Sequence, residues 1–485
     1  MHGLDTNKNM KSGTAQILKT ALCLTLIGAV AVVHADGIIG EEPALGAPEA
    51  RITQGEVESG HLTLHDLRVA GLKVFTTQFN QYDGYGDGPV NPLDKTVPGG
   101  RPTLQGNGTF LRVNGLDSQT CLECHSIIST QTTPFTMGVG GAGGLNNSAM
   151  FFTRAIDVED AANQGFAGFD GRVINPPAVF GTGGVQQVGK EMTTRLQKLM
   201  QRATNNPGQV VRLTAKGVNF GTIIADSAGN VDTSNVEGVA DDLVIRPFGR
   251  KGEFSSVRGF DQGAMMFHLG MQPVEIVGEG IDEDGDGVVN EIQIGEMSVL
   301  GIFVTTQETP RQTGMNRKAR AGFRQFKTIG CADCHRPALT TESRKLSYSF
   351  PEVENDPSAN VFFEVDLHKG PMKFKRARRG GIRVPMFSDL KRHDMGDGLK
   401  EAFHGGDDKF NREFITAKLW GVADTSPYLH DGRALTINTA ILAHGGAAQA
   451  ARDTYDGLAN EKKNEVLAFL NTLRNPVNPN KDVLD

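Results

Sequence analysis

The chain has 485 residues, of which 38% are hydrophobic and 22% are charged, and its formal net charge is −7. This composition is that of a globular protein, and the length suggests two or three domains. The acidic balance gives no reason to expect nucleic-acid binding and suits small or basic partners.

The N-terminus carries the pattern of an export signal. Basic residues up to Lys19 precede an apolar run over residues 21–33, and Val33-His34-Ala35 forms a small-x-small cleavage site. An uncleaved anchor is the alternative, but a bilayer-spanning helix needs about 20 apolar residues and this run is shorter. The sequence therefore predicts a signal peptide over residues 1–35, a periplasmic or secreted protein, and no membrane span in the mature chain.

Helix and turn patterns follow in the first half of the chain. The periodicity predicts helices over residues 61–74 and 187–204, with turn-rich and glycine-rich stretches at 82–88 and 138–144 between them. From residue 210 onward, β-branched runs alternate with turn residues, which predicts a β insertion at about 205–250.

An acidic loop comes next, and it begins like an EF-hand calcium loop. The expected ligands are three carboxylates and one main-chain carbonyl at alternate positions: Asp282, Asp284, Asp286 and Val288. Position twelve is Gln293 rather than Glu, so Glu291 or Glu296 would have to replace it. The pattern predicts a structural calcium site over residues 282–293, with a solvated acidic turn as the alternative.

Two short motifs carry the chemistry. Cys121-Leu122-Glu123-Cys124-His125 and Cys331-Ala332-Asp333-Cys334-His335 match the c-type haem attachment signature. In such motifs two thiols form thioethers with the porphyrin, and the histidine binds the iron. A zinc site made of two distant Cys-x-x-Cys pairs, or a thioredoxin-like redox pair, would leave both histidines unexplained. The sequence predicts two haem c groups, with His125 and His335 as proximal ligands.

These motifs define the expected architecture. Further helices are expected over residues 315–328, just before the second motif, and over 460–474. We expect a mainly α protein with two c-type cytochrome-like haem domains and a β insertion in or after the first. The predicted boundaries are an N-terminal haem domain over 36–310 and a C-terminal cytochrome c-like haem domain over 311–485.

The ligand on the other side of each iron decides what each haem can do. A haem with two strong protein ligands carries electrons, whereas an open position binds peroxide or oxygen. No histidine lies between His125 and His268, so the sequence predicts no nearby distal histidine at the first haem. Met137, Met150 and Met192 are alternative ligands, although helical methionines usually fill a core.

The C-terminal part resembles a known family. The stretches Leu419-Trp420-Gly421, Thr425-Ser426-Pro427-Tyr428-Leu429-His430-Asp431-Gly432-Arg433-Ala434 and Ala443-His444-Gly445-Gly446 are similar to those of the bacterial di-haem cytochrome c peroxidase superfamily. The nearer match is its branch called di-haem oxidoreductase, or thiol oxidoreductase, which Phe387-Ser388-Asp389-Leu390 and Phe248-Gly249-Arg250-Lys251 also resemble. The similarity extends over most of the mature chain and is strongest after residue 311.

The resemblance implies one electron-storing haem and one peroxide-reacting haem. His444 falls where the peroxidases place a distal methionine and would make the second haem bis-histidine, with Met395 as the competing ligand. Glu191 is a candidate catalytic acid by its order along the chain, with a solvated helix-surface Glu as the alternative. The inter-haem tryptophan of the peroxidases is not evident, because the single tryptophan, Trp420, falls beside the second haem.

The resemblance also implies a calcium ion between the haems. The peroxidases bind it through an Asn side chain before a proline and two carbonyls of a Thr-x-Pro turn. Asn175, Thr425 and Pro427 match those positions. Amide and main-chain oxygens suit calcium, and two ordinary proline turns are the alternative.

Taken with the motifs, the resemblance predicts an exported di-haem c-type oxidoreductase, peroxidase-like, in which one haem relays electrons to a more open haem. The expected partners are a small electron-donor protein or cytochrome and a small oxidant such as hydrogen peroxide. Two alternatives stay open: an electron-transfer cytochrome with both irons six-coordinate, and an accessory redox enzyme that modifies another protein.

Overall fold

The computed structural model describes residues 42–86, 119–128, 150–157, 168–401 and 408–484. The predicted signal peptide, the glycine-rich stretch at 138–144 and Met137 lie outside these residues. Within them, no helix is both long enough and apolar enough to cross a membrane.

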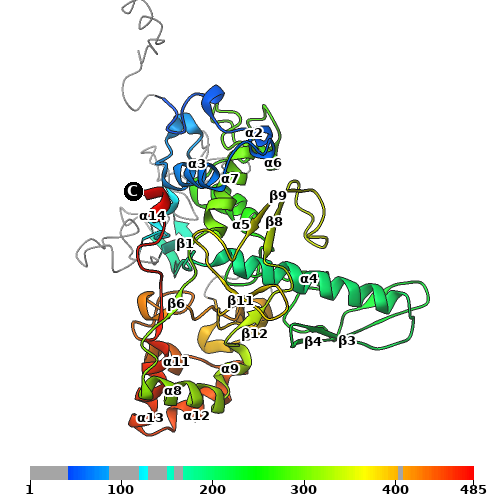
Figure 1. Cartoon of the computed structure of the whole chain (residues 1–485), viewed down its shortest axis with the longest axis vertical. Coiled ribbons are helices and arrows are strands. Elements are labelled where there is room, and N and C mark those ends of the chain that lie inside the picture. Colours follow the sequence, from blue (N-terminus) through cyan, green and yellow to red (C-terminus); the bar gives the residue numbers. More distant parts are fainter. Residues whose placement is uncertain (1–41, 87–118, 129–149, 158–167, 402–407, 485) are drawn as a thin grey trace, which may run out of the picture. The chain divides into compact units, whose positions relative to one another are not determined.

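Helices provide most of the regular structure (Figure 1). Their bounds are α2 (Gln54–Glu58), α3 (Leu64–Thr76), α4 (Thr182–Thr204), α5 (Val257–Ala264), α6 (Val274–Val277), α7 (Ile294–Thr305), α8 (Arg317–Thr328), α9 (Cys331–Cys334), α10 (Asp408–Arg412), α11 (Ile437–Leu442), α12 (Gln449–Asp456), α13 (Asn460–Leu470) and α14 (Lys481–Leu484). A π-helix, Met265–Leu269, continues directly from α5.

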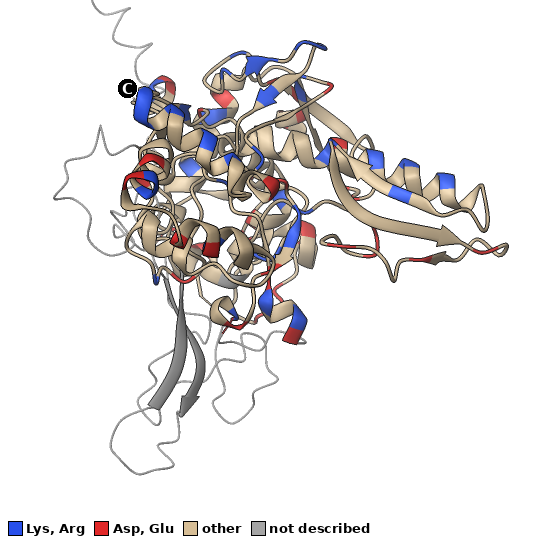
Figure 2. Cartoon of the chain, turned by 90° about the horizontal axis from the view of Figure 1, so that it is seen from below, with Lys and Arg blue, Asp and Glu red and all other residues tan. Residues whose placement is uncertain are grey.

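Local signals explain where two of the predicted helices begin. α3 begins at Leu64 because Thr63 and Asp66 form a capping box, in which each side chain accepts the main-chain N–H of the other residue. α4 begins at Thr182, directly after Gly181, whose φ of 76° lies in the left-handed region. Arg195, Lys198 and Arg202 are exposed along α4, and Figure 2 shows basic residues along this helix.

The strands are short and antiparallel, and in the part of the chain that the structure describes they form six small sheets. The sheets are β1–β2 (Met150–Asp157, Gly168–Ile174), β3–β4–β5 (Val211–Ala215, Val218–Ala225, Val231–Asp232), β8–β9 (Lys345–Ser349, Val361–Asp366), β12–β13 (Arg392–Asp394, Glu413–Ile415), β14–β6 (Leu473–Arg474, Arg311–Gln312) and β10–β11–β7 (Lys375–Arg376, Ile382–Val384, Leu339–Thr340).

These strands change the predicted fold class. The chain is a mixture of helix and sheet, 38% helical and 14% strand, rather than mainly α. Most of the strands are too short to give a clear alternation of apolar and polar residues, so a search for periodicity overlooks them. The sheet β3–β4–β5 lies within the segment of the predicted insertion, and the buried Leu213 and Phe220 join it to the core against α4.

Two hydrophobic cores hold the described residues together. The larger core surrounds α7, which is buried on nearly every side, and includes residues beyond 311 such as Leu367 and Trp420. The smaller core lies between α8 and α13, where Phe326 and Phe469 meet edge to face at 5.2 Å. Residues 43–485 form one compact unit, and the predicted division at 310/311 stays a prediction.

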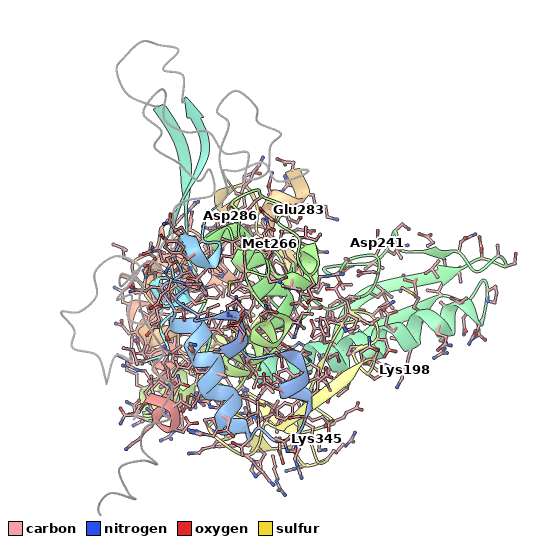
Figure 3. The ribbon with its side chains drawn as sticks, turned by 90° about the horizontal axis from the view of Figure 1, so that it is seen from above. Lys198, Asp241, Met266, Glu283, Asp286 and Lys345 are labelled. Atoms are coloured by element: carbon pink, nitrogen blue, oxygen red, sulfur yellow. The ribbon has the colours of Figure 1, made fainter. Side chains whose placement is uncertain are left out.

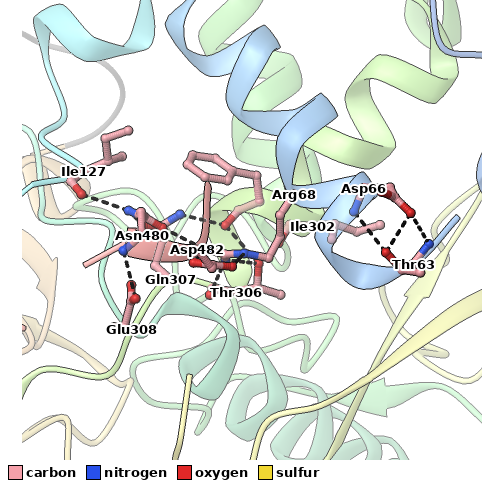
Figure 4. A network of polar contacts seen from close by, with 11 residues as sticks. Thr63, Asp66, Arg68, Ile127, Ile302, Thr306, Gln307, Glu308, Asn480 and Asp482 are labelled. Carbon is pink, nitrogen blue, oxygen red and sulfur yellow. Dashed lines mark hydrogen bonds and ion pairs between the residues drawn. The ribbon is translucent and has the colours of Figure 1, made fainter. Parts of the chain in front are cut away.

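A buried polar network joins the C-terminal segment to α3 (Figure 4). Arg68, with 1% of its surface exposed, donates to the main-chain oxygen of Thr306 at 2.6 Å, to Asn480 at 2.9 Å and to Asp482 at 3.0 Å. Asn480 in turn donates to the main-chain oxygen of Ile127 at 2.8 Å. The network therefore ties the chain just after the first Cys motif to the C-terminal segment.

Candidate functional site

The first Cys motif forms a tight turn, and the ring of its histidine is hydrogen-bonded to a main-chain carbonyl. A 3₁₀ turn, Cys121–Glu123, is closed by the His125 amide, which donates to the Cys121 carbonyl at 2.9 Å. The His125 ring donates from Nδ1 to the Pro177 carbonyl at 2.9 Å. Because burial lowers the pKa of His125 to about 4, the imidazole is neutral, and Nε2 is the nitrogen that can bind a metal.

The second Cys motif repeats this arrangement. The His335 amide donates to the Cys331 carbonyl at 2.9 Å, and Nδ1 of His335 donates to the Phe387 carbonyl at 3.1 Å. Phe387 has a φ of 56°, which is a strained left-handed conformation. This is the residue whose carbonyl orients the imidazole ring of His335. Burial and, second to it, the neighbouring His444 together lower the pKa of His335 to about 4.

The four cysteines are suited to thioether attachment. Cys121, Cys124, Cys331 and Cys334 form no disulfide, so neither Cys-x-x-Cys pair is closed. Burial raises the pKa of Cys331 to about 11 and raises that of Cys121 well above its ordinary value, so these thiols are neutral. Each open pair of cysteines is followed directly by a neutral histidine, which fits covalent attachment of a haem.

A second histidine faces the second motif. The rings of His335 and His444 have centroids 6.4 Å apart, and Nδ1 of His444 donates to the Ala440 carbonyl at 2.7 Å. Two imidazoles bound to one metal through nitrogens about 2 Å away have centroids roughly 6 Å apart. The pair therefore has the spacing of two axial ligands. Met395 lies next to this pair through its main chain, which packs against Gly445.

The surroundings of the first motif correct one sequence argument. His268, on the π-helix, is far from His125 in the sequence, but it lies close enough for its charge to lower the pKa of His125. Asp261 of α5 acts on Cys121 in the same way by raising its pKa. Asp261 is buried, and its Oδ2 has no hydrogen-bond partner among the described residues. A histidine, which was not expected, and a buried acid other than the predicted Glu191 thus lie near the first motif.

Of the three methionines proposed as distal ligands, the structure describes the side chain of Met192 alone. Met192 is fully buried and belongs to the larger core. Met137 and the side chain of Met150 lie outside the described part. For Met192, core filling is therefore the role that the structure supports.

Glu191 is bound on all sides. Its carboxylate accepts from Lys216 Nζ at 2.6 Å, from Gln187 at 3.0 Å and from the main-chain amides of Glu342 and Ser343 at 2.8 and 2.9 Å. These bonds join α4 to the β3–β4 turn and to the chain before β8. A carboxylate held by four donors is poorly suited to exchange protons, so we do not include Glu191 in the mechanism below.

Asn175 and Pro427 meet, as the resemblance implied. The side-chain nitrogen of Asn175 donates to the carbonyls of Pro427 and Leu429 at 2.7 and 2.9 Å. Its main-chain N–H donates to the His430 carbonyl at 2.9 Å. The Ser426–Pro427 peptide is cis. Turning the amide by 180° would direct its oxygen toward the same carbonyls, which is the donor set calcium prefers. Thr425 is two residues from Pro427.

Motifs that are distant in the sequence meet beside His430. The Lys251 ammonium donates to the carbonyls of Phe410 and Asn411 and lies 3.6 Å from the centroid of the Phe414 ring. Phe414 in turn lies 4.5 Å from the His430 ring, centroid to centroid. Burial lowers the pKa of His430 to about 4. Lys251 was recognised only as part of a family motif, and its packing role was not expected.

Trp420 connects the segments that hold the two proximal histidines. A methyl group at Gly181 would lie 2.7 Å from the indole, so the ring packs directly on Gly181, four residues after Pro177. Next to it, the Leu419 amide donates to the Met386 carbonyl at 3.0 Å, one residue before Phe387. The sequence associated Trp420 with the second motif alone, because position in a chain gives no sign of the Gly181 contact.

Known proteins are similar to parts of this chain. A family model described as "Di-haem oxidoreductase, putative peroxidase" matches residues 369–473, and no curated protein matches the chain. Among solved structures, the chain is similar to hydrazine synthase of Kuenenia stuttgartiensis, pressurised with xenon, with 15% identity over 38% of this chain and 56% of that one and a TM-score of 0.23. It is also similar to a MauG-like protein associated with microbial copper homeostasis, with 12% identity over 61% of this chain and 90% of that one and a TM-score of 0.27.

The TM-scores of these two structures are too low to support an assignment of function. The assignment therefore rests on the family match. It covers the segment that contains Phe387, His430 and His444, and a family of this kind implies an oxidoreductase with haem cofactors. The resemblance drawn from the sequence is therefore confirmed: residues 369–473 match the model of the di-haem oxidoreductase, putative peroxidase family.

Proposed function

We propose that this chain is an exported, peroxidase-like di-haem c-type oxidoreductase, in which the second motif holds a closed haem and the first a more open one. The observation that carries the proposal is the 6.4 Å spacing of His335 and His444. His125 instead has Pro177 as its hydrogen-bond partner and His268 as an electrostatic neighbour. Export rests on the N-terminal pattern alone, which predicts a periplasmic or secreted location.

The residues of each motif have separable tasks. Cys121, Cys124, Cys331 and Cys334 would tether the haems, and the main-chain carbonyls of Pro177 and Phe387 would hold His125 and His335 in the tautomer that binds iron. When bound, the closed haem stores and supplies an electron and the open haem supplies the iron at which a small oxidant such as hydrogen peroxide is reduced. A small electron-donor protein or cytochrome would supply the electrons.

Two groups near the first motif are suited to move protons during peroxide reduction. An imidazole can both accept and donate a proton, and this is the role we assign to His268. Burial raises the pKa of Asp261 well above its ordinary value, which favours the protonated carboxyl that can donate a proton. Splitting an O–O bond requires a proton at the departing oxygen, and these two residues take the role first considered for Glu191.

Two further features would support the pair of haems. Trp420 packs between the segments that hold His125 and His335 and would provide an aromatic contact between them. A calcium ion bound by Asn175, Thr425 and Pro427 would fix the same segments to each other, because Asn175 already meets the Pro427 carbonyl. Calcium removal is then expected to disturb both motifs together.

Turnover of peroxide by the purified exported protein, with a reduced donor, tests the proposal. We expect reduction of peroxide by the wild-type protein, a loss of about 100-fold or more in kcat with His268→Ala or Asp261→Asn, and a change of less than about twofold with Glu191→Gln. The absence of turnover in a protein that contains both haems would contradict it.

His268 also supports a second candidate function. If His268 ligated the first iron, both haems would be six-coordinate and the chain would be an electron-transfer cytochrome. The visible spectrum separates the two functions. A ferric high-spin band that shifts on adding cyanide indicates an open iron, whereas two low-spin haems unaffected by cyanide indicate the cytochrome.

A further inference from the structure

The acidic loop brings three carboxylates to one point. Oxygen atoms of Asp282, Asp284 and Asp286 all lie within 4.8 Å of one another. Gly285 and Gly287 have φ of 74° and 92°, a left-handed backbone that lets alternate side chains turn to the same face. Figure 3 labels Asp286 on this loop. Hydrogen bonds within the loop maintain this shape, but they do not by themselves indicate a ligand.

Glu291 provides a second and independent indication. Its side chain is only 1% exposed, and its Oε1 has no hydrogen-bond partner among the described residues, whereas its Oε2 accepts the Gln272 amide at 2.7 Å. Burial raises the pKa of Glu291 to about 9, and the charges of the three aspartates add to this rise. Glu291 is not itself among the carboxylates that lie within 4.8 Å of one another, but the three aspartates are near enough to act on it. An unpaired buried carboxylate oxygen near other carboxylates is unfavourable unless a cation neutralises them.

The nearby arginine does not supply that cation. Arg51 donates to the main-chain carbonyls of Asn290 and Glu291 at 3.2 and 2.6 Å, but its guanidinium pairs with the Glu296 carboxylate at 2.5 Å. Both partners of that pair are buried, with 7% and 3% of their side chains exposed. Glu296 is therefore committed to Arg51, which leaves Glu291 as the carboxylate that can replace Gln293 at position twelve.

We propose that one calcium ion binds the carboxylates of Asp282, Asp284, Asp286 and Glu291 together with the main-chain carbonyl of Val288. These five oxygens and bound water would supply the roughly six to eight oxygen ligands that calcium takes. Magnesium prefers a smaller octahedron and keeps most of its water, so a cluster of four carboxylates favours calcium. The site uses no residue of either Cys motif and does not depend on the function proposed above.

The ion would also stabilise a neighbouring segment. Gln272, held by Glu291 Oε2, accepts the Glu283 amide through its side chain at 3.1 Å, and the Val274 amide donates to the Ile292 carbonyl at 2.9 Å. Gln272 follows the π-helix that carries His268 by three residues. Calcium that fixes Glu291 therefore also fixes the end of this π-helix.

Calorimetric titration of the metal-stripped holoprotein with calcium chloride tests the site, with Glu291→Gln as the variant. Glu283→Gln is the matched control, because Glu283 is an exposed carboxylate of the same loop (Figure 3). We expect Glu291→Gln to remove one bound calcium per chain or to weaken it at least tenfold, and Glu283→Gln to bind as the wild type does. Calcium should slow hydrogen exchange over residues 265–274 in the wild type and the control only.

The melting temperature is a second readout, because Glu291→Gln should change it in opposite directions without and with calcium. Without metal, Glu291→Gln should raise the melting temperature, because it removes an unsatisfied buried carboxylate, and with calcium it should lower it. A merely structural role of Glu291 would lower it in both conditions and would overturn the proposal. So would equal calcium binding by the wild type and Glu291→Gln. If Glu291→Gln does not fold, Asp286→Asn replaces it with the same expected loss of calcium.

Discussion

The two Cys motifs have the same local geometry but different surroundings. In each motif the histidine amide closes the turn onto the first cysteine, and Nδ1 of the histidine donates to a distant carbonyl, that of Pro177 or of Phe387. Around His335, a second imidazole stands at the spacing of an axial ligand. Around His125, the neighbours are His268 and the buried Asp261. The attachment sequence therefore fixes the proximal side, and the rest of the fold decides how each haem is used.

Removing the second imidazole should make the two motifs alike. We expect His444→Ala to convert the second haem completely from low spin to high spin and to let it bind cyanide, which the visible and electron paramagnetic resonance spectra would record. His368→Ala is the control, because its Nδ1 also binds a main-chain carbonyl, that of Phe374, at 2.8 Å. A second haem that stays low-spin in His444→Ala would indicate Met395 as the ligand.

Removing the imidazole near the first motif should act on catalysis rather than on haem content. His268→Ala is expected to lower kcat for peroxide by about 100-fold or more while both haems remain attached, since a positioned acid–base group contributes at least that much. A shift of the first haem from low spin to high spin in this variant would instead identify His268 as a ligand and support the electron-transfer function.

The buried network behind the first motif offers a way to destabilise one region. Arg68→Ala leaves Asn480 and Asp482 without their common partner, and we expect it to lower the free energy of unfolding by about 3 kcal/mol. Hydrogen exchange should increase over residues 119–128, which Asn480 holds through Ile127, and change little over 331–335. Equal effects on both segments would contradict this separation.

The contact between the two regions should have a smaller effect. Trp420→Leu removes the aromatic ring that packs on Gly181, and we expect electron transfer between the haems to slow by about tenfold, with a cost of about 3 kcal/mol in stability from the lost packing. Trp420→Phe, which keeps an aromatic ring, should restore most of the rate. Rapid-mixing spectroscopy after reduction of one haem would measure it.

The smallest effect on activity is expected at Glu191. Glu191→Gln weakens the bond to Lys216 and the bonds to the amides of Glu342 and Ser343, so it should reduce stability by about 1 kcal/mol and change peroxide turnover by less than twofold. Thermal unfolding and steady-state kinetics would measure the two effects. A large loss of turnover without a loss of stability would return Glu191 to the active site.

Sequence patterns predicted local features better than distant contacts. The Cys motifs, the helix of α4 and the acidic loop are each contained in a short stretch, and the resemblance identified His444 because its flanking residues are similar to those of the family. His268 was dismissed because the argument used distance along the chain, whereas the π-helix brings it back toward His125.

Other differences have equally specific causes. Glu191 was selected by chain order, which gives no indication that Lys216 on the β3–β4 turn reaches its carboxylate. The sheets were underestimated because strands such as β7 and β14 contain two residues each and depend on partners far along the chain. The choice between Glu291 and Glu296 required the ion pair of Glu296 with Arg51, a residue that lies far earlier in the chain.

Electron paramagnetic resonance of the purified ferric protein, before and after addition of cyanide, tests the difference between the two motifs most directly. The predicted result is one low-spin and one high-spin haem per chain. Adding cyanide should replace the high-spin signal only. Two low-spin haems that ignore cyanide, or a protein without haem, would contradict it.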